Sequence, residues 1–196
     1  MGRKKNRNTR AKIVTAAWEL FYRQGYENTT VEEIIEESHT SRGSFYHYFN
    51  GKDGLLSSLS YLFDDKYEEL METLDPERSA FDILLYLNYE LFSMIERTVP
   101  VELLAQMYAS QLITRGEKHL LDRDRIYYRL LRQTVRTGQE RGELRQDLPS
   151  NEIVKSYALC ERALLYDWCI CGGEYSLRDY SAQMMPRYLG YIRSEN

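Results

Sequence analysis

The segment TSRGSFYHYF, residues 40–49, concentrates side chains that can donate hydrogen bonds. Its small polar residues let the backbone approach a binding partner closely, and its arginine can donate to a guanine edge or to a phosphate oxygen. Its three polar rings carry a hydroxyl or an imidazole, which can also donate to phosphate oxygens. Phe45 and Phe49 are four residues apart and share one face of a helix, so we expect them in the core. An aromatic core helix alone would explain these two phenylalanines but not the polar residues beside them.

Three cysteines, Cys160, Cys169 and Cys171, could also carry chemistry. Their number is odd and the basic start of the chain lacks the apolar segment of an export signal, so we expect a cytoplasmic protein without a disulfide framework. We interpret them as small apolar residues of one helix, while a redox or metal role, or an unrelated helical enzyme that uses the Cys169 thiolate, stays open. We find no metal-binding box, phosphate loop or nucleophile–base pair, so no catalytic residue, metal or cofactor is expected.

Composition predicts a globular chain with an uneven charge. Hydrophobic residues make up 43% of the 196 residues and charged residues 29%, and no apolar run is long enough to cross a membrane. Residues 1–54 carry nine Lys/Arg against seven Asp/Glu, whereas residues 55–196 carry 17 against 23. The first twelve residues hold six Lys/Arg and no acid. This basic arm indicates contact with a polyanion, although a solvated tail would show the same charges.

Apolar residues recur at helical spacing along nearly the whole chain, and no strand pattern competes. We therefore predict an all-α fold of about nine helices. One long fourth helix is expected to start at Lys52 and to carry a continuous apolar stripe from Leu55 to Leu70. Pro186 falls inside the last predicted helix, 176–193, and should kink it because proline removes a backbone donor.

Residues 30–38 and 41–49 form two short predicted helices joined by a tight turn. Thr30 begins the first as an N-cap, and Glu33 completes a capping box three residues later. Two such helices fit the helix-turn-helix pattern, in which the second helix lies in the major groove of DNA. The first helix is acidic, and we expect most of its carboxylates to face solvent; they are Glu32, Glu33, Glu36 and Glu37.

Residues 9–56 carry several motifs at fixed spacing. The first predicted helix ends in F-x-x-x-G-Y, the second opens with T-T-V-x-x-I, and the third reads S-R-G-S-F-Y-x-x-F with a lysine soon after. With these motifs, the segment resembles the N-terminal DNA-binding domain of the TetR family of bacterial transcriptional regulators. A stretch R-G-E-L-R-x-D-L at 141–148 is also typical of that family. The resemblance implies that residues 1–54 form the DNA-binding domain and that residues 55–196 form an effector-binding and dimerisation domain.

The resemblance also implies a set of DNA contacts. The implied residues are Thr30 on a phosphate; Ser41, Arg42, Gly43 and Ser44 in the groove; Tyr46 and His47 on phosphates or bases; and Lys52 on a phosphate. Three positions depart from the family pattern. His39 replaces the usual glycine of the turn, where a positive φ is expected and histidine is among the better-tolerated residues. Thr40 replaces a small apolar residue, and Tyr48 stands where histidine is frequent.

The C-terminal half is expected to hold a dimer interface and an effector pocket. In the family, the last two long helices pair across a two-fold axis, and residues 150–171 and 176–193 fit that role. The candidate interface residues, which an internal core would explain equally well, are Leu164, Leu165, Trp168, Met185, Tyr188, Leu189 and Ile192. Tyrosines suit small-molecule pockets as well as ordinary packing, and the candidate pocket residues are Tyr86, Tyr89, Met107, Tyr108, Tyr127 and Tyr157.

These patterns favour a sequence-specific DNA-binding transcriptional regulator that acts as a homodimer on a palindromic operator in double-stranded DNA. By resemblance it would be a repressor that an unknown small-molecule effector releases, with the long fourth helix as the mechanical link. The alternative is a DNA-binding adaptor whose C-terminal half binds a protein partner.

Overall fold

The structure, a computed structural model, describes residues 2–75, 77–113 and 118–194, with side chains from Thr9 onward. In these segments the chain forms ten α-helices, two short 3₁₀ helices and one isolated β-bridge. The helices are α1 (Gly2–Gln24), α2 (Val31–Glu37), α3 (Arg42–Tyr48), α4 (Asp53–Leu56), α5 (Leu59–Thr73), α6 (Ala80–Thr98), α7 (Val101–Ile113), η1 (His119–Leu121), α8 (Ile126–Glu140), α9 (Ser150–Ile170), α10 (Leu177–Leu189) and η2 (Gly190–Ile192). The all-α prediction is confirmed, and Pro186 lies within α10. None of these helices is long and apolar enough to span a membrane.

The fourth helix was predicted to be continuous, and this prediction is wrong. α4 ends at Leu56 and α5 begins at Leu59, so two serines separate them. Ser57 Oγ donates to Gly54 O at 2.7 Å, and Ser58 Oγ donates to Leu55 O at 2.5 Å. Serine hydroxyls that bond to nearby carbonyls compete with helical hydrogen bonding, which explains a break at this point of the stripe.

The described chain divides into two compact units. The N-terminal unit consists of Met1–Tyr61 and Glu102–His119, and the C-terminal unit consists of Leu62–Val101 and Leu120–Asn196. This division differs from the expected boundary at residue 54 and places nearly all of α7 with α1 to α4.

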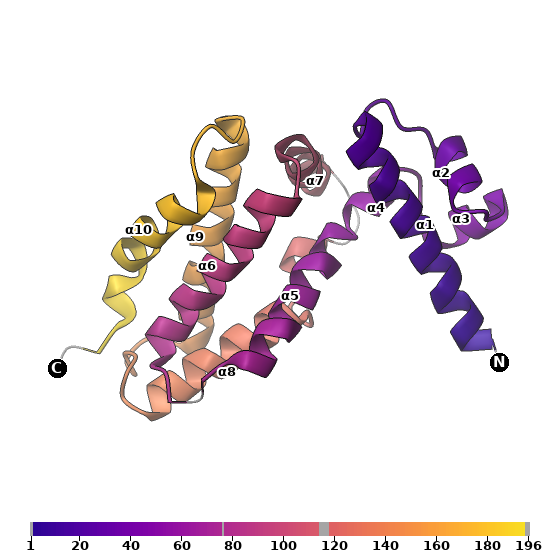
Figure 1. Cartoon of the computed structure of the whole chain (residues 1–196). Coiled ribbons are helices and arrows are strands. Elements are labelled where there is room, and N and C mark those ends of the chain that lie inside the picture. Colours follow the sequence, from indigo (N-terminus) through magenta and orange to yellow (C-terminus); the bar gives the residue numbers. More distant parts are fainter. Residues whose placement is uncertain (1, 76, 114–117, 195–196) are drawn as a thin grey trace. The chain divides into compact units, whose positions relative to one another are not determined.

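In the N-terminal unit, α1, α2 and α3 pack on one another (Figure 1). Leu20 of α1, Ile34 of α2 and Phe45 of α3 are almost fully buried, which joins the three helices in one core. The turn between α2 and α3 requires a left-handed residue, and His39 adopts a φ of 51° there. Histidine thus occupies the position where the family usually has glycine, and the turn keeps its geometry.

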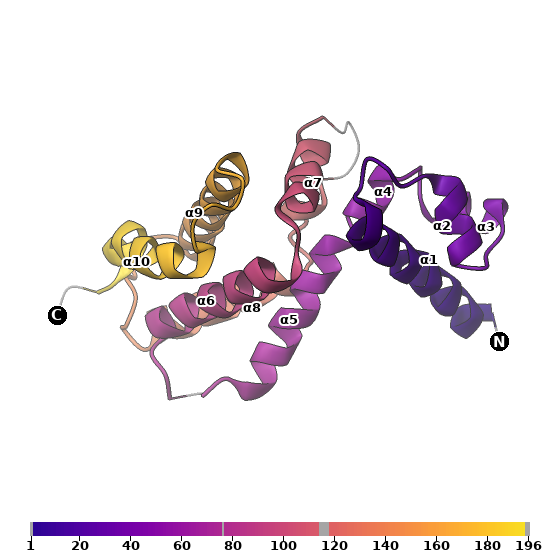
Figure 2. The same ribbon diagram turned by 45° about the horizontal axis from the view of Figure 1, so that its top comes forward.

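In the C-terminal unit, α6 packs against α8 and α10, and α9 packs against the same two helices (Figures 1 and 2). Leu84 and Phe92 of α6 and Tyr157 of α9 are fully buried at its centre. The bundle therefore has its own core, which an N-terminal cap on α6 helps to fix: Ser79 Oγ accepts from Asp82 N at 3.1 Å.

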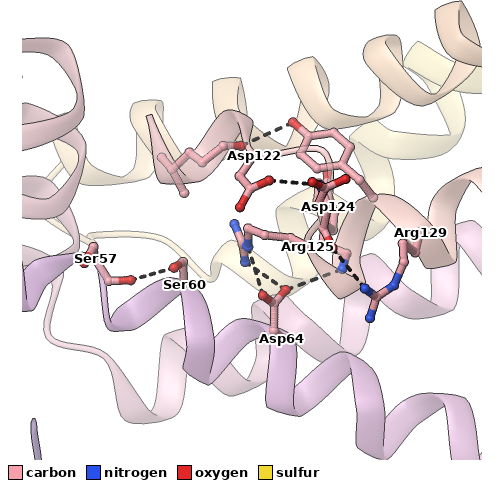
Figure 3. Close-up of polar contacts among 10 residues, drawn as sticks. Ser57, Ser60, Asp64, Asp122, Asp124, Arg125 and Arg129 are labelled. Atoms are coloured by element: carbon pink, nitrogen blue, oxygen red, sulfur yellow. Dashed lines mark hydrogen bonds and ion pairs between the residues drawn. The ribbon is translucent and has the colours of Figure 1, made fainter. Parts of the chain in front are cut away.

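A nearly buried ion pair joins α5 to the start of α8 (Figure 3). Arg125 Nε lies 2.9 Å from Asp64 Oδ2, and Arg125 Nη2 lies 3.0 Å from Asp64 Oδ1. Only 8% of the Asp64 side chain and 10% of the Arg125 side chain are exposed. The two parallel bonds make the bidentate geometry in which an arginine binds a carboxylate most strongly.

The R-G-E-L-R-x-D-L stretch ties three parts of the C-terminal unit together. Glu143 Oε2 accepts from the first backbone N–H of α6, that of Ala80, at 2.6 Å. Leu144 forms the isolated bridge with Arg193, and Arg145 N donates to Ile192 O at 2.9 Å. The stretch thus connects the end of α8 to the start of α6 and to the segment after α10, which gives a physical reason for this sequence.

Gly138 is required by close packing at this junction. A Cβ atom on Gly138 would lie 2.4 Å from Ala80 Cβ and 2.9 Å from Leu144 Cδ1. Because Ala80 Cβ is fixed to the backbone, we expect Gly138→Ala to lower the free energy of unfolding by about 1–2 kcal/mol despite its better helix propensity. Urea unfolding measures the loss. Gly190→Ala is the control, since a Cβ there has nothing within 4 Å; an equal response of both variants would contradict the packing argument.

Candidate nucleic-acid interface

The first helix of the motif is held by a complete capping box. Glu33 N donates to Thr30 Oγ1 at 3.2 Å, and Thr30 N donates to Glu33 Oε2 at 2.7 Å. The predicted box is therefore present. Thr30 Oγ1 also donates to Glu33 Oε2, at 2.8 Å, so both donors of Thr30 are committed to one carboxylate. A phosphate contact by Thr30 would require Glu33 to release one of them.

The second helix presents the predicted binding face to solvent. Ser41 is the N-cap of α3, and its Oγ accepts from Ser44 N at 3.1 Å. Phe45 and Phe49 are 0% and 5% exposed, so the expected core face is confirmed. On the other face Ser44 is half-buried, and the exposed members of the predicted set are Ser41, Arg42, Gly43, Tyr46 and His47. Folding thus places Phe45 and Phe49 in the core and Tyr46 and His47 in solvent, while Tyr48 is half-buried.

Arg42 is the exposed cation of this face and has two neighbours. Its Nη1 lies 3.3 Å from Glu32 Oε1 on α2, and its Cζ lies 5.6 Å from the centre of the Tyr46 ring. Both charged side chains stay largely in water, with 70% of Arg42 and 65% of Glu32 exposed. The guanidinium is therefore available to a ligand while its position is already restricted.

The acidic residues of α2 have specific partners that the sequence did not reveal. Three of the four are exposed, as expected, and Glu33 is half-buried. Glu37 Oε2 lies 3.4 Å from Arg23 Nη2 on α1, Glu33 caps the helix, and Glu32 approaches Arg42. These pairings reduce the unfavourable field that four carboxylates would otherwise set up near a nucleic acid.

Lys52 fastens the loop between α1 and α2 to the start of α4. Its Nζ donates to Tyr26 O at 2.6 Å and lies 4.2 Å from the centre of the Tyr26 ring. The Tyr26 hydroxyl donates to Asp53, and burial together with this carboxylate raises the pKa of Tyr26. The G-Y pair at the end of the first helix thus has a structural partner in the lysine, and a phosphate contact by Lys52 would be an additional role.

The six candidate pocket residues are divided between the two units. Met107 and Tyr108 lie on α7 and belong to the N-terminal unit. Tyr86 and Tyr89 on α6 line a shallow cavity of about 360 Å³ with Asn88 and with Met185 of α10. Tyr127 and Tyr157 are buried inside the C-terminal unit.

The sequence pattern did not predict the polar cluster that lies inside the C-terminal bundle. Glu161 of α9 is only 4% exposed, and it accepts from Asn88 Nδ2 at 3.0 Å and from the Tyr127 hydroxyl at 2.7 Å. Tyr157, one turn away on α9, donates to Leu84 O at 2.9 Å. Burial raises the pKa of Glu161, and the hydrogen bonds from Asn88 and Tyr127 partly oppose that rise. The signal in the sequence was a charged residue at a position of the apolar stripe of its helix.

The raised pKa of Glu161 predicts a pH-dependent stability. The folded protein binds this proton more tightly than the unfolded chain, so the contribution is fully present below the ordinary pKa of 4.5 and is lost as the pH rises through the folded pKa. We expect wild type to lose stability relative to Glu161→Gln, which cannot ionise, as urea unfolding is repeated from pH 4.5 to pH ~8. Exposed Glu174→Gln should show no such trend, and a constant offset for Glu161→Gln would refute the assignment.

Six of the seven candidate interface residues are buried within the protomer. The six, at 0–5% exposure, are Leu164, Leu165, Trp168, Met185, Leu189 and Ile192, and only Tyr188 is exposed, at 50%. The six fill the core between α9, α10 and their neighbours, which is the alternative that the apolar pattern left open. The same helices expose a different set of apolar residues: Leu159, Tyr166, Ile170, Tyr180 and Tyr191, beside Tyr188.

The three cysteines are half-buried free thiols. Burial raises the pKa of the Cys160 thiol and raises that of Cys169 to about 11. A thiol with a raised pKa carries little thiolate at neutral pH, which argues against nucleophilic chemistry at Cys160 and Cys169. Across the described residues, no group of three His, Cys, Asp or Glu side chains is placed to hold a metal ion.

A packed helix-turn-helix whose second helix exposes a polar face is the arrangement of DNA-binding regulators. Residues 13–59 match the family model described as bacterial regulatory proteins, tetR family. An uncharacterized HTH-type transcriptional regulator of Lactococcus lactis subsp. lactis is 46% identical over 46 residues, 24% of this chain and 24% of that protein. The chain therefore spans about a quarter of the length of this relative. HbdR of Aromatoleum sp. (strain CIB), an HTH-type transcriptional regulator, is 26% identical over 177 residues, 87% of this chain and 75% of that protein.

The fold continues beyond the matched domain. The crystal structure of Thermus thermophilus FadR, a TetR-family transcriptional repressor in complex with lauroyl-CoA, aligns with a TM-score of 0.79 and 24% identity over 95% of this chain and 96% of that one. At this identity the likeness concerns the fold alone. Residues 13–59 thus match the DNA-binding part of TetR-family transcriptional regulators, and the chain as a whole shares the fold of the FadR structure.

Proposed function

We propose that this protein is a cytoplasmic, homodimeric transcriptional repressor that binds a palindromic operator and leaves it when a small-molecule effector binds. The observation that carries the proposal is the solvent-exposed face of α3, where Ser41, Arg42, Gly43, Tyr46 and His47 stand clear of the core residues Phe45 and Phe49. A helix with this division can enter the major groove without disturbing its own packing.

Each member of the face has a role that fits its chemistry. Arg42 would donate to a guanine edge, and Ser41, Gly43 and Ser44 would let the backbone approach the bases. Tyr46 and His47 would donate to phosphate oxygens and fix the register. Thr30 and Lys52 would each contact a phosphate with a donor that is engaged internally in the free protein.

The dimer is proposed to form through the exposed apolar residues of α9, α10 and η2. On α9, Leu159, Tyr166 and Ile170 recur at spacings of seven and four, so they share one face of the helix. Tyr188 and Tyr191 extend an exposed apolar surface on α10 and η2. Exposed aromatic and aliphatic side chains of this kind are typical of homodimer interfaces.

The effector is proposed to bind in the C-terminal unit, where Asn88, Tyr127 and Glu161 form a polar cluster in an apolar bundle. Pockets for small molecules combine apolar walls with a few convergent polar groups. Because the similar Thermus thermophilus structure holds lauroyl-CoA, acyl-CoA thioesters are the first class to test. A thermal-shift series over acyl chain lengths should raise Tm for a ligand of the native state. A rise in Tm without loss of operator binding would leave the ligand without an effector role and would favour the adaptor alternative.

The central experiment is a selection of genomic DNA fragments by the purified protein at roughly physiological salt, where non-specific binding is weak. We expect enrichment of a short palindrome whose half-sites lie about one helical turn apart, as two copies of α3 related by two-fold symmetry would require. Sedimentation of the protein on that site should give two protomers per palindrome. Fragments no more enriched than random DNA would overturn the proposed function.

A further inference from the structure

Glu32 occupies an unusual position for an acidic residue near a DNA-binding surface. Its Oε1 lies 3.3 Å from Arg42 Nη1, and the Tyr46 ring lies on the same guanidinium, 5.6 Å from Arg42 Cζ. Arg42 and Tyr46 are four residues apart on α3, whereas Glu32 reaches them from α2. The arginine is therefore held by one group of its own helix and one group of the neighbouring helix.

The pair has little value for folding stability. Both side chains are largely in water, at 70% and 65% exposure, and exposed ion pairs contribute almost nothing to a folding equilibrium. The two neighbouring carboxylates have other structural partners: Glu33 completes the capping box and Glu37 pairs with Arg23. A carboxylate beside the arginine also repels phosphates, so it lowers the affinity of this face for DNA of any sequence.

We propose that Glu32 is a positioning residue that sets sequence specificity by holding the Arg42 guanidinium for one base. The planar guanidinium has five N–H donors in a fixed fork, so a carboxylate at Nη1 leaves the other donors oriented for a base edge. The same carboxylate disfavours the alternative in which Arg42 turns to the sugar-phosphate backbone, which is specificity by repulsion of the wrong contact. The inference rests on the proposed DNA binding and names a residue of that interface.

The test compares Glu32→Gln with Glu36→Gln, which removes the same charge from an exposed site one helical turn away on α2. Base preferences come from a DNA selection with each variant, and affinities come from fluorescence anisotropy on the selected duplex and on random duplex. We expect Glu32→Gln to bind random DNA more tightly and to lose about 1.5-fold to fivefold of its preference at one base pair, the range of an exposed ion pair. Glu36→Gln should leave the preference unchanged.

A double variant separates positioning from direct contact. In an Arg42→Ala background, Glu32→Gln should cause no further change in base preference, because the side chain that it positions is gone. A change that persists in this background would mean that Glu32 contacts DNA itself, for example by accepting from a cytosine amino group, and would overturn the inference. An equal change from Glu36→Gln would reduce the effect to net charge and would also overturn it.

The outcome also distinguishes this inference from the proposed function. A wild-type protein that selects no site refutes the DNA-binding proposal as a whole. A wild-type protein that selects a clear site, with a Glu32→Gln variant of unchanged preference, refutes only the role of Glu32. Circular dichroism and urea unfolding of every variant check that the helix content and the stability match those of wild type, and the base preference is a readout that a purely structural role would not alter.

Discussion

Asp64→Ala is expected to lower the free energy of unfolding by about 3–5 kcal/mol, because it leaves the Arg125 guanidinium without its carboxylate in a nearly buried site. The two side chains are 8% and 10% exposed and are joined by two hydrogen bonds of 2.9 and 3.0 Å. Tyr127 N, in the first turn of α8, also donates to Asp64 Oδ1 at 3.4 Å. Removal of the carboxylate therefore also takes away the acceptor of this backbone N–H. Urea unfolding of the purified variant measures the loss.

Two further variants test whether the loss of stability comes from the buried ion pair. Asp65→Ala removes a neighbouring exposed carboxylate and should change stability by no more than about 0.5 kcal/mol. Replacing both members of the pair, as in Asp64→Leu with Arg125→Met, should recover much of the loss, since no unpaired charge stays buried. If Asp64→Ala unfolds at the same urea concentration as wild type, the pair is not the link between α5 and α8 that the geometry describes.

Arg42→Ala is expected to weaken binding to the preferred operator by about 1–3 kcal/mol and to relax the preference at one base pair. The side chain is 70% exposed on the solvent face of α3, so its loss leaves the core residues Phe45 and Phe49 undisturbed and the fold intact. The weakening should be confined to DNA that carries the preferred base. Anisotropy titrations against a set of single-base variants of the operator measure both effects.

Arg23→Ala supplies the matched control for charge. Arg23 is also an exposed arginine paired with a glutamate, but it lies on α1 and not on the recognition helix. The Arg23→Ala variant should bind DNA slightly more weakly, and by the same factor for all sequences. If Arg42→Ala behaves in the same way, Arg42 contacts a phosphate, and the base-reading role must move to another residue of the face.

The local elements of the DNA-binding helices were predictable because each depends on neighbours in the sequence. The capping box of Thr30 and Glu33 and the four-residue spacing of Phe45 and Phe49 are local signals, and the structure confirms both. The break at Ser57 and Ser58 was missed because an apolar stripe continues through it, whereas the hydroxyls of both serines bond to nearby carbonyl groups and the backbone changes to a turn.

Predictions that depend on distant partners were less complete. An apolar stripe indicates that a helix face is buried but not what covers it. The pattern therefore left a dimer interface and an internal core open for Trp168 and Met185, which are 4% and 1% exposed within one protomer. Glu161 and Asn88 are 73 residues apart, and their contact exists only after α6 and α9 have packed. The same holds for Glu32 and Arg42, whose pairing requires the turn at His39.

The interleaving of the two units constrains how this regulator can be synthesised and engineered. The chain leaves the N-terminal unit after Tyr61 and returns to it at Glu102, and Gln106 on the returning segment donates to Glu27 Oε1 at 2.7 Å. During synthesis, the DNA-binding helices leave the ribosome about forty residues before the segment that completes their unit. A chimera that receives a foreign DNA-binding head cut at Tyr61 alone would keep the old α7, so the two segments must be exchanged together.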